Sequence, residues 1–167
     1  DFVVKSPGVS DTTDIIKFYL DKGIRIISEI EFAYNFSKSP IIGITGTNGK
    51  TTTTTLVHKL IYDANISCSI SGNIGNSFSS VCDNSVQYSV VELSSFQLDG
   101  IDRFKPHIAI LTSISPDHLD RYTNYKAYIE SKFRITKNQS AKDYLIYNSD
   151  CNEINNYLKT NNINSIL

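Results

Sequence analysis

Three absences restrict what this sequence can be. No apolar run approaches the roughly 18 residues that a membrane-spanning helix needs. No charge excess marks a partner of nucleic acid or of an acidic membrane surface, because the 167 residues carry a formal net charge of −1. No signal peptide is visible in the given sequence. We therefore expect no nucleic-acid partner and no membrane insertion.

Cysteine is scarce, and its placement excludes two further classes, the disulfide scaffold and the zinc finger. Cys68, Cys82 and Cys151 are odd in number, lie far apart and lack the spacing of zinc ligands. They favour reduced thiols and therefore a cytoplasmic protein. The sequence also opens on Asp1 rather than methionine, with apolar residues from Phe2 onward. We interpret it as a piece of a longer protein.

The chain is rich in apolar strands that alternate with helices. With 40% hydrophobic and 20% charged residues, it has the composition of a folded protein. Strands are predicted in DFVVK, IRIIS, IIGIT, SCSIS, QYSVVELSS, HIAILTSI and DYLIYNS, the first of them short and buried. Helices are predicted over residues 11–23, 29–38, 51–64, 124–138 and 151–161. This order predicts an α/β fold with a mainly parallel sheet, and a domain boundary at Ser37–Pro40.

The helix over residues 51–64 begins with five consecutive threonines. Each β-branched threonine costs up to ~0.7 kcal/mol relative to alanine inside a helix, so the run needs a reason. For Thr54 and Thr55, packing under the sheet is the simplest explanation. His58 is expected to face solvent. The expected buried side consists of Leu56, Val57, Leu60 and Ile61.

The segment before that helix predicts a phosphate-binding loop. An apolar strand runs into a glycine turn, then Lys-Thr, then the helix. Gly46 and Gly49 allow backbone N–H groups to converge on phosphate oxygens at a helix start that carries partial positive charge. Lys50 can reach the β- and γ-phosphates, and the Thr51 hydroxyl can hold Mg²⁺. The residues expected to contact the nucleotide are Gly46, Thr47, Asn48, Gly49, Lys50, Thr51, Thr52 and Thr53.

The loop departs from the strict P-loop pattern in one position. That pattern requires glycine at position 44, which is Ile44 here, while Gly43 is one position too early. A glycine turn followed by a capped helix would be the plain alternative. The Gly-Lys-Thr sequence at a strand-to-helix junction favours a variant phosphate loop instead.

The variant loop GITGTNGKTT resembles the ATP loop of the Mur ligases, which extend the peptide of bacterial cell-wall precursors. Four further segments resemble that family in their order and spacing: KSPGV, SGNIG, VVELSSFQL and SPDHLDRY. GNIG and ELSSFQL favour the branch that adds D-glutamate to UDP-N-acetylmuramoyl-L-alanine. The resemblance implies a P-loop NTPase-like central domain over residues 39–167, preceded by the end of a Rossmann-like, UDP-substrate-binding domain over residues 1–38. It implies a monomer, and a C-terminal amino-acid-binding domain outside this chain.

The reaction implied by the resemblance is ATP-dependent amide formation. A substrate carboxylate attacks the γ-phosphate to give an acyl phosphate and ADP, and the incoming amine then displaces phosphate. Lys50, Glu92, His118 and Lys132 carry over as catalytic residues, and Thr51, Glu92, His118 and Lys132 as metal-binding residues.

Glu92 and His118 follow neighbouring apolar segments of the chain. A buried carboxylate at a strand end needs a cation, although Glu92 could instead face water. His118 could be an ordinary loop histidine. Because the carboxyl ends of parallel strands share one edge, Thr51, Glu92 and His118 can meet there.

Lys132 reads by itself as an ordinary helix lysine. In the family, the matching lysine is carbamylated by CO₂ and helps to organise magnesium. Alignment of DHLDRY and the following helix places Lys132 at that position, with Lys137 as the alternative if the register shifts. A lysine of depressed pKa can react with CO₂. We therefore expect ATP, Mg²⁺ and a carbamylated Lys132.

The substrate-binding residues implied by the resemblance are Ser6, Asn73, Ser94 and Gln97. Ser6 matches a loop that touches the UDP-sugar, and Asn73 the region of the phosphates, although Asn73 could also simply end a turn. Ser94 and Gln97 match the muramoyl-alanine end. Contacts to D-glutamate fall outside this chain.

Two other functions stay open at this point. One is a different Mur or folylpolyglutamate-type ligase, and the other is a nucleotide-binding module without ligase chemistry. Glu92, His118 and Lys132 distinguish the second, because simple nucleotide binding does not require all three. The piece alone is expected to be inactive, since it lacks the amino-acid-binding domain.

Overall fold

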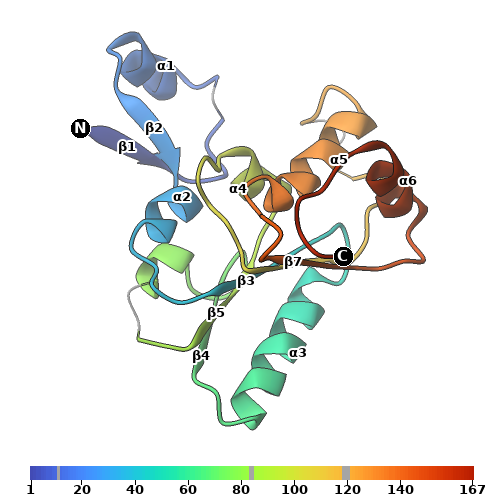
Figure 1. Ribbon diagram of the computed structural model, residues 1–167. Coiled ribbons are helices and arrows are strands. Elements are labelled where there is room, and N and C mark those ends of the chain that lie inside the picture. The colour runs from blue at the N-terminus through green and yellow to red at the C-terminus, as the bar shows by residue number, and fades with distance from the viewer. Residues whose placement is uncertain (11, 83–84, 118–120) are drawn as a thin grey trace.

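The centre of the molecule is a parallel sheet. The computed structural model describes residues 1–10, 12–82, 85–117 and 121–167. Its main sheet has five strands in the order β4-β5-β3-β6-β7, and every neighbouring pair is parallel (Figure 1). The strands are β3 (Ile41–Thr45), β4 (Cys68–Gly72), β5 (Tyr88–Glu92), β6 (Ile108–Leu111) and β7 (Tyr144–Tyr147). The predicted α/β class with a parallel sheet is confirmed.

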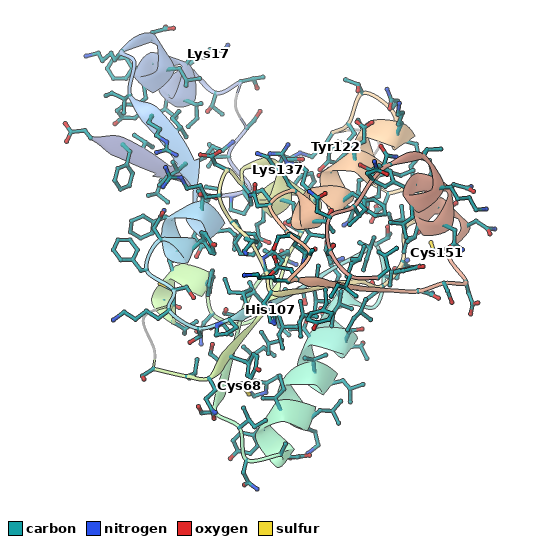
Figure 2. The ribbon with its side chains drawn as sticks, viewed as in Figure 1. Lys17, Cys68, His107, Tyr122, Lys137 and Cys151 are labelled. Atoms are coloured by element: carbon teal, nitrogen blue, oxygen red, sulfur yellow. The ribbon has the colours of Figure 1, made fainter. Side chains whose placement is uncertain are left out.

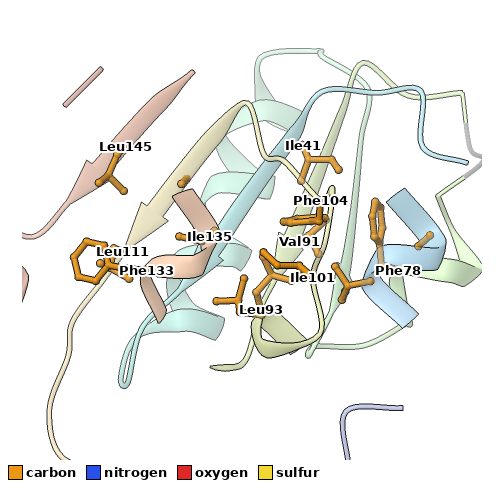
Figure 3. Close-up of a cluster of buried hydrophobic side chains, with 14 of the residues drawn as sticks. Ile41, Phe78, Val91, Leu93, Ile101, Phe104, Leu111, Phe133, Ile135 and Leu145 are labelled. Atoms are coloured by element: carbon orange, nitrogen blue, oxygen red, sulfur yellow. The ribbon is translucent and has the colours of Figure 1, made fainter. Parts of the chain in front are cut away.

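Helices cover the two faces of this sheet unequally. On one face lies α3 (Lys50–Asp63), where Val57 and Ile61 pack against Ile42, Ile44 and Val90. The opposite face carries the larger core, which is drawn in Figure 3. The elements that contribute to it are α2 (Glu29–Tyr34), the 3₁₀ helix η1 (Phe78–Ser80), α4 (Ser95–Asp99), α5 (Tyr125–Phe133), the 3₁₀ helix η2 (Arg134–Thr136) and α6 (Asn152–Thr160).

A second, smaller sheet lies at the start of the chain. β1 (Phe2–Lys5) and β2 (Arg25–Ser28) pair in parallel, with α1 (Asp14–Asp21) between them in sequence. The prediction that β1 is buried is wrong: Phe2 is 52% exposed. Two strands and one short helix offer too little surface to cover it.

The helix α2 joins this small sheet to the main body. Its Ile30 and Ala33 belong to the large core, and its Glu31 carboxylate is buried. Glu31 accepts hydrogen bonds from the backbone N–H groups of Asp102, Arg103 and Phe104 at 2.8, 2.9 and 3.0 Å. The small sheet is thereby joined to the large core through α2, while the division into residues 1–38 and 39–167 stays a prediction.

The buried side of α3 differs from the predicted one. Leu56 and Leu60 are 55% and 61% exposed, so this part of the prediction is wrong. The side facing the sheet is built from Thr54, Val57 and Ile61, which follow the helical spacing of three and four residues. Thr54 can be fully buried because its hydroxyl donates to the Lys50 carbonyl at 2.8 Å. His58, expected to face solvent, is half-buried.

Packing against the sheet explains only part of the threonine run. Thr54 packs against the sheet, as expected, whereas Thr55 is exposed, so packing does not account for Thr55.

The predicted helix over residues 124–138 is divided into two elements: α5 ends at Phe133 and η2 follows. Arg134, at that junction, donates to the carbonyls of Leu98 and Ile101 at 2.8 and 3.0 Å. Within the described part of the chain, no helix has the length and apolarity required to cross a bilayer.

Candidate functional site

The loop between β3 and α3 adopts the shape that its glycines permit. Gly49 is the N-cap of α3 with a left-handed backbone (φ 83°), and Gly46 has φ 151°. A Cβ added at Gly46 would collide with the Thr112 hydroxyl and press on the backbone of Ser113. Glycine is therefore needed at position 46 both for its conformation and for the close approach of two chain segments.

Thr112 and Ser113 hold this loop from the end of the neighbouring strand β6. The Thr47 N–H donates to the Ser113 carbonyl at 2.7 Å, and the Asn48 N–H donates to the Ser113 hydroxyl at 3.1 Å. The Thr112 hydroxyl donates to the Asn48 carbonyl at 2.7 Å. Sequence reasoning missed these two residues. The signal available was a pair of hydroxyl side chains directly after an apolar strand that ends at the same edge as β3.

Lys50 folds back over the loop. Its ammonium donates to the carbonyls of Gly46 and Thr47 at 3.0 and 2.9 Å. These contacts place a positive charge beside the N-terminus of α3, where the free N–H groups of a helix already favour an anion. Of the other predicted loop residues, Thr52 is exposed and Thr53 is half-buried.

Glu92 lies at the end of β5, directly beside the start of α3. It is only 1% exposed. The Thr51 hydroxyl donates to one carboxylate oxygen at 2.8 Å, and the Asn73 amide donates to the other at 2.9 Å. The structure thus brings Thr51, Asn73 and Glu92 together, although they lie far apart in the sequence.

The Glu92 carboxylate fits a cation. Its described partners, Thr51 and Asn73, are both neutral, and a buried carboxylate without a positive partner is costly. Its oxygens and the Thr51 hydroxyl are the hard oxygen ligands that Mg²⁺ prefers. Among the described residues, no group of three or more His, Cys, Asp or Glu is arranged to hold a metal. A cation here would thus need further ligands, and the predicted ligand His118 lies outside the described residues.

Lys132 reaches the same loop from α5. It is 2% exposed, and its ammonium donates to the Gly46 carbonyl at 2.8 Å, so it shares this acceptor with Lys50. Burial, and then the positive charge of Lys50, lower the pKa of Lys132 to about 7. The alternative residue, Lys137, lines a different pocket, together with Tyr157 and Asn162.

Three of these residues, Lys50, Asn73 and Lys132, line one pocket of about 320 Å³. Ser94 lies at its wall, whereas Ser6 is exposed next to the wall residues Pro7 and Gly8. Gln97 is buried and caps a helix: its side-chain oxygen accepts from the Ser94 N–H and hydroxyl at 2.9 and 3.1 Å. The lining consists of Pro7, Gly8, Lys50, Asn73, Ser94, Ser95, Phe96, Asp117, Tyr128 and Lys132.

These groups lie together at the edge of the main sheet where β3, β5 and β6 end. A glycine loop, a helix N-terminus and two lysines can hold phosphate, and a buried carboxylate beside a hydroxyl can hold a divalent cation. The family model for the Mur ligase middle domain matches residues 44–167. The chain belongs to the Mur ligase family. The predicted family is confirmed.

Relatives within the Mur ligase family align with almost the whole length of this chain. A UDP-N-acetylmuramoylalanine--D-glutamate ligase of Christiangramia forsetii is 54% identical over 168 residues, covering 99% of this chain and 38% of the relative. The ligase of the same name from Listeria monocytogenes serotype 4b is 44% identical over 162 residues, covering 95% of this chain and 36% of the relative. The chain thus spans less than two fifths of the length of either relative.

Solved Mur ligase structures share the fold. The crystal structure of UDP-N-acetylmuramate:L-alanyl-gamma-D-glutamyl-meso-diaminopimelate ligase from Neisseria meningitides superposes with a TM-score of 0.72 at 15% identity, covering 98% of this chain and 57% of that one. The MurF ligase from Thermotoga maritima, solved in complex with ADP, has a TM-score of 0.62 at 16% identity and covers 99% of this chain and 46% of that one.

Proposed function

We propose that the intact protein is an ATP-dependent ligase that joins D-glutamate to UDP-N-acetylmuramoyl-L-alanine. The observation that carries this proposal is the meeting of Lys50, Thr51, Glu92 and Lys132 around one phosphate loop. The choice of D-glutamate is supported by the relatives at 54% and 44% identity, whose names specify that amino acid.

The phosphate loop binds and orients ATP in this proposal. The N–H groups at the start of α3 and the Lys50 ammonium hold the β- and γ-phosphates, which neutralises charge and aligns the γ-phosphorus. Lys50 would exchange its contacts with the Gly46 and Thr47 carbonyls for phosphate oxygens. A carboxylate oxygen of the substrate forms a bond to the γ-phosphorus while the bond to the bridging oxygen breaks, and ADP leaves.

The second half of the reaction needs only positioning from this chain. The amine of D-glutamate attacks the acyl carbon, loses a proton, and displaces phosphate to leave the amide. Ser94 and Asn73, which line the pocket, would hold the acceptor substrate, and Ser6, which precedes the lining residues Pro7 and Gly8, would contact its UDP-sugar. Gln97 acts through Ser94, because its side chain holds that residue at the helix start.

Thr51 and Glu92 would hold Mg²⁺, which supplies charge neutralisation to the phosphates when bound. His118 and a carbamylated Lys132 complete the proposed set. An amine with a pKa of about 7 is about half neutral at pH 7, and the neutral form is the one that reacts with CO₂. Reaction of the neutral amine with CO₂ forms a nitrogen–carbon bond, releases one proton and leaves an anionic carbamate. Starting from the ammonium form, two protons are released in all.

The test is amino-acid-dependent phosphate release by the full-length protein with UDP-N-acetylmuramoyl-L-alanine and ATP. We expect turnover with D-glutamate and little with L-lysine, diaminopimelate or L-glutamate. Preference for another amino acid would point to a different ligase of the family. ATP binding without turnover for any amino acid would favour the non-catalytic module.

The carbamate is tested separately with Lys132→Ala. We expect this variant to lose activity and to regain part of it with added short carboxylates. Lys137→Ala is the matched control, because Lys137 lines another pocket. Full activity of Lys132→Ala would contradict the carbamate role while leaving the ligase assignment in place.

A further inference from the structure

Tyr128 contacts both the phosphate loop and the buried lysine. It is fully buried on the inner side of α5. Its hydroxyl lies 3.0 Å from the Thr47 hydroxyl, and the Lys132 ammonium lies 5.0 Å from the centre of its ring. The spacing of four residues between Tyr128 and Lys132 places both side chains on one face of the helix. One side chain therefore bridges two parts of the site that come from distant segments.

The Thr47 hydroxyl is the centre of a small hydrogen-bond network. It donates to the Ser115 carbonyl at 3.2 Å and accepts from the Ser115 N–H at 3.1 Å. With the Tyr128 O–H as donor, the Thr47 proton is left for the Ser115 carbonyl, and all three contacts are satisfied at once. The Thr47 side chain is thereby held by Ser115, in the segment after β6, and by Tyr128 of α5.

This network bears directly on the groups that face the nucleotide. The carbonyls of Gly46 and Thr47 accept from Lys50, and the Gly46 carbonyl also accepts from Lys132. A rotation of the peptide units around Thr47 would therefore move the acceptors of both lysines. The hydroxyl of Tyr128 opposes such a rotation, because it holds the side chain of Thr47, the residue that joins these peptide units.

A purely structural role would not need the hydroxyl. The Tyr128 ring packs against Tyr122 and Tyr125, with ring centres 5.4 and 6.4 Å apart, and phenylalanine would do the same. Burying a hydroxyl is costly unless it is hydrogen-bonded, and the hydroxyl of Tyr128, unlike that of Tyr125, has a partner in the phosphate loop.

We propose that Tyr128 is a positioning residue for ATP: its hydroxyl fixes Thr47, and its ring supports Lys132 beside the same loop. The inference rests on the proposed function, since it assumes that the loop binds ATP. The hydroxyl and the ring of Tyr128 have different roles in this proposal, and a substitution can remove one of them without the other. Tyr128→Phe removes the bond to Thr47 and keeps the ring beneath Lys132.

The experiment measures ATP binding and steady-state kinetics of the full-length protein. We expect Tyr128→Phe to raise the KM and Kd for ATP about fivefold, the scale of one hydrogen bond, with a smaller change in kcat. Thr47→Val should act in the same direction. Thr47→Val also removes the two bonds to Ser115, so it should be the worse single variant. The double variant should be no worse than Thr47→Val, because the bond to Tyr128 is already lost there.

Tyr125→Phe is the matched control. Tyr125 lies on the same helix, and its hydroxyl is buried without a hydrogen-bond partner among the described residues. Its removal should leave the KM for ATP unchanged. Thermal unfolding of each variant separates loss of fold from loss of positioning.

Three outcomes would overturn the inference. They are an unchanged Kd for ATP in Tyr128→Phe, additive effects in the double variant, and a lowered melting temperature with unchanged kinetics. If the wild-type protein itself fails to bind ATP, the proposed function fails first and the inference with it. Normal ATP binding by both wild type and Tyr128→Phe contradicts the inference alone.

Discussion

At the scale of single residues, Glu92 shows a conflict between stability and function. It is buried among the neutral side chains of Thr51 and Asn73 within the described structure. An unpaired buried charge costs free energy of folding, and a protein keeps one where the charge is used. Asp143 differs from Glu92, because its buried charge has positive partners and stabilises the fold.

Glu92→Gln should therefore separate the two properties. We expect at least a hundredfold loss of ligase turnover, on the order of the effect of removing one electrostatic group from an active site. We expect an unchanged or higher melting temperature, because the neutral amide is cheaper to bury. Calorimetric unfolding and turnover at saturating Mg²⁺ measure both. A strongly destabilised variant would show that Glu92 is a structural residue.

Asp143 is the residue whose charge stabilises the fold. It precedes β7, and it accepts hydrogen bonds from Ser140, contacts His107 at 3.2 Å and forms an ion pair with Lys105 at 3.2 Å. Burial by itself would raise its pKa, but the bonds from Ser140, His107 and Lys105 outweigh it and lower the pKa of Asp143 to about 2. His107, labelled in Figure 2, directly precedes β6, so it lies at the amino end of that strand, whereas the phosphate loop follows the carboxyl end of β3.

This pKa predicts how stability depends on pH. A carboxyl group with a lowered folded-state pKa stabilises the fold above its unfolded pKa of 3.8, and that stability is lost as pH falls from about 4 toward 2. The contribution is about 2 kcal/mol at neutral pH. Urea unfolding of wild type and Asp143→Asn should differ by about that amount at pH 7 and converge near pH 2. A difference that is independent of pH would contradict this account.

At the scale of elements, the helix α3 is positioned by one threonine of its run. Thr54 faces the sheet and Thr55 faces solvent, so the two neighbours form a matched pair. Thr54→Lys should lower the free energy of unfolding by about 3 kcal/mol or more, since it buries an unpaired charge. Thr55→Lys should change it by no more than about 0.5 kcal/mol. Equal effects in chemical denaturation would show that the assigned face of α3 is wrong.

The connection between α2 and the main body depends on Glu31. Its carboxylate accepts from three consecutive backbone N–H groups after α4. Glu31→Gln places an NH₂ group where only acceptors fit, and we expect a loss of about 3 kcal/mol of stability. Glu130→Gln, at an exposed position of α5, is the control. Thermal unfolding that leaves both variants equal to wild type would contradict the role of Glu31.

At the scale of the whole molecule, the strand order explains why the site forms. β5 and β6 flank β3 on either side, so the segments that follow these three strands end at one edge of the sheet. The loop after β3 thereby meets Glu92 from β5 and Thr112 from β6. Their convergence was predictable in outline from parallel strands, whereas the order of the strands was not, because pairing partners lie far apart in sequence.

The sequence by itself determined the alternation of strands and helices, the glycine loop and the family. These features depend on residues within a few positions of one another, which a linear pattern contains. Only the tertiary structure decided that Thr54 rather than Leu56 or Leu60 packs on the sheet, and that the Lys132 amine meets the Gly46 carbonyl 86 positions away. Burial and pKa arise from contacts between distant segments, and those contacts exist only once the chain has folded.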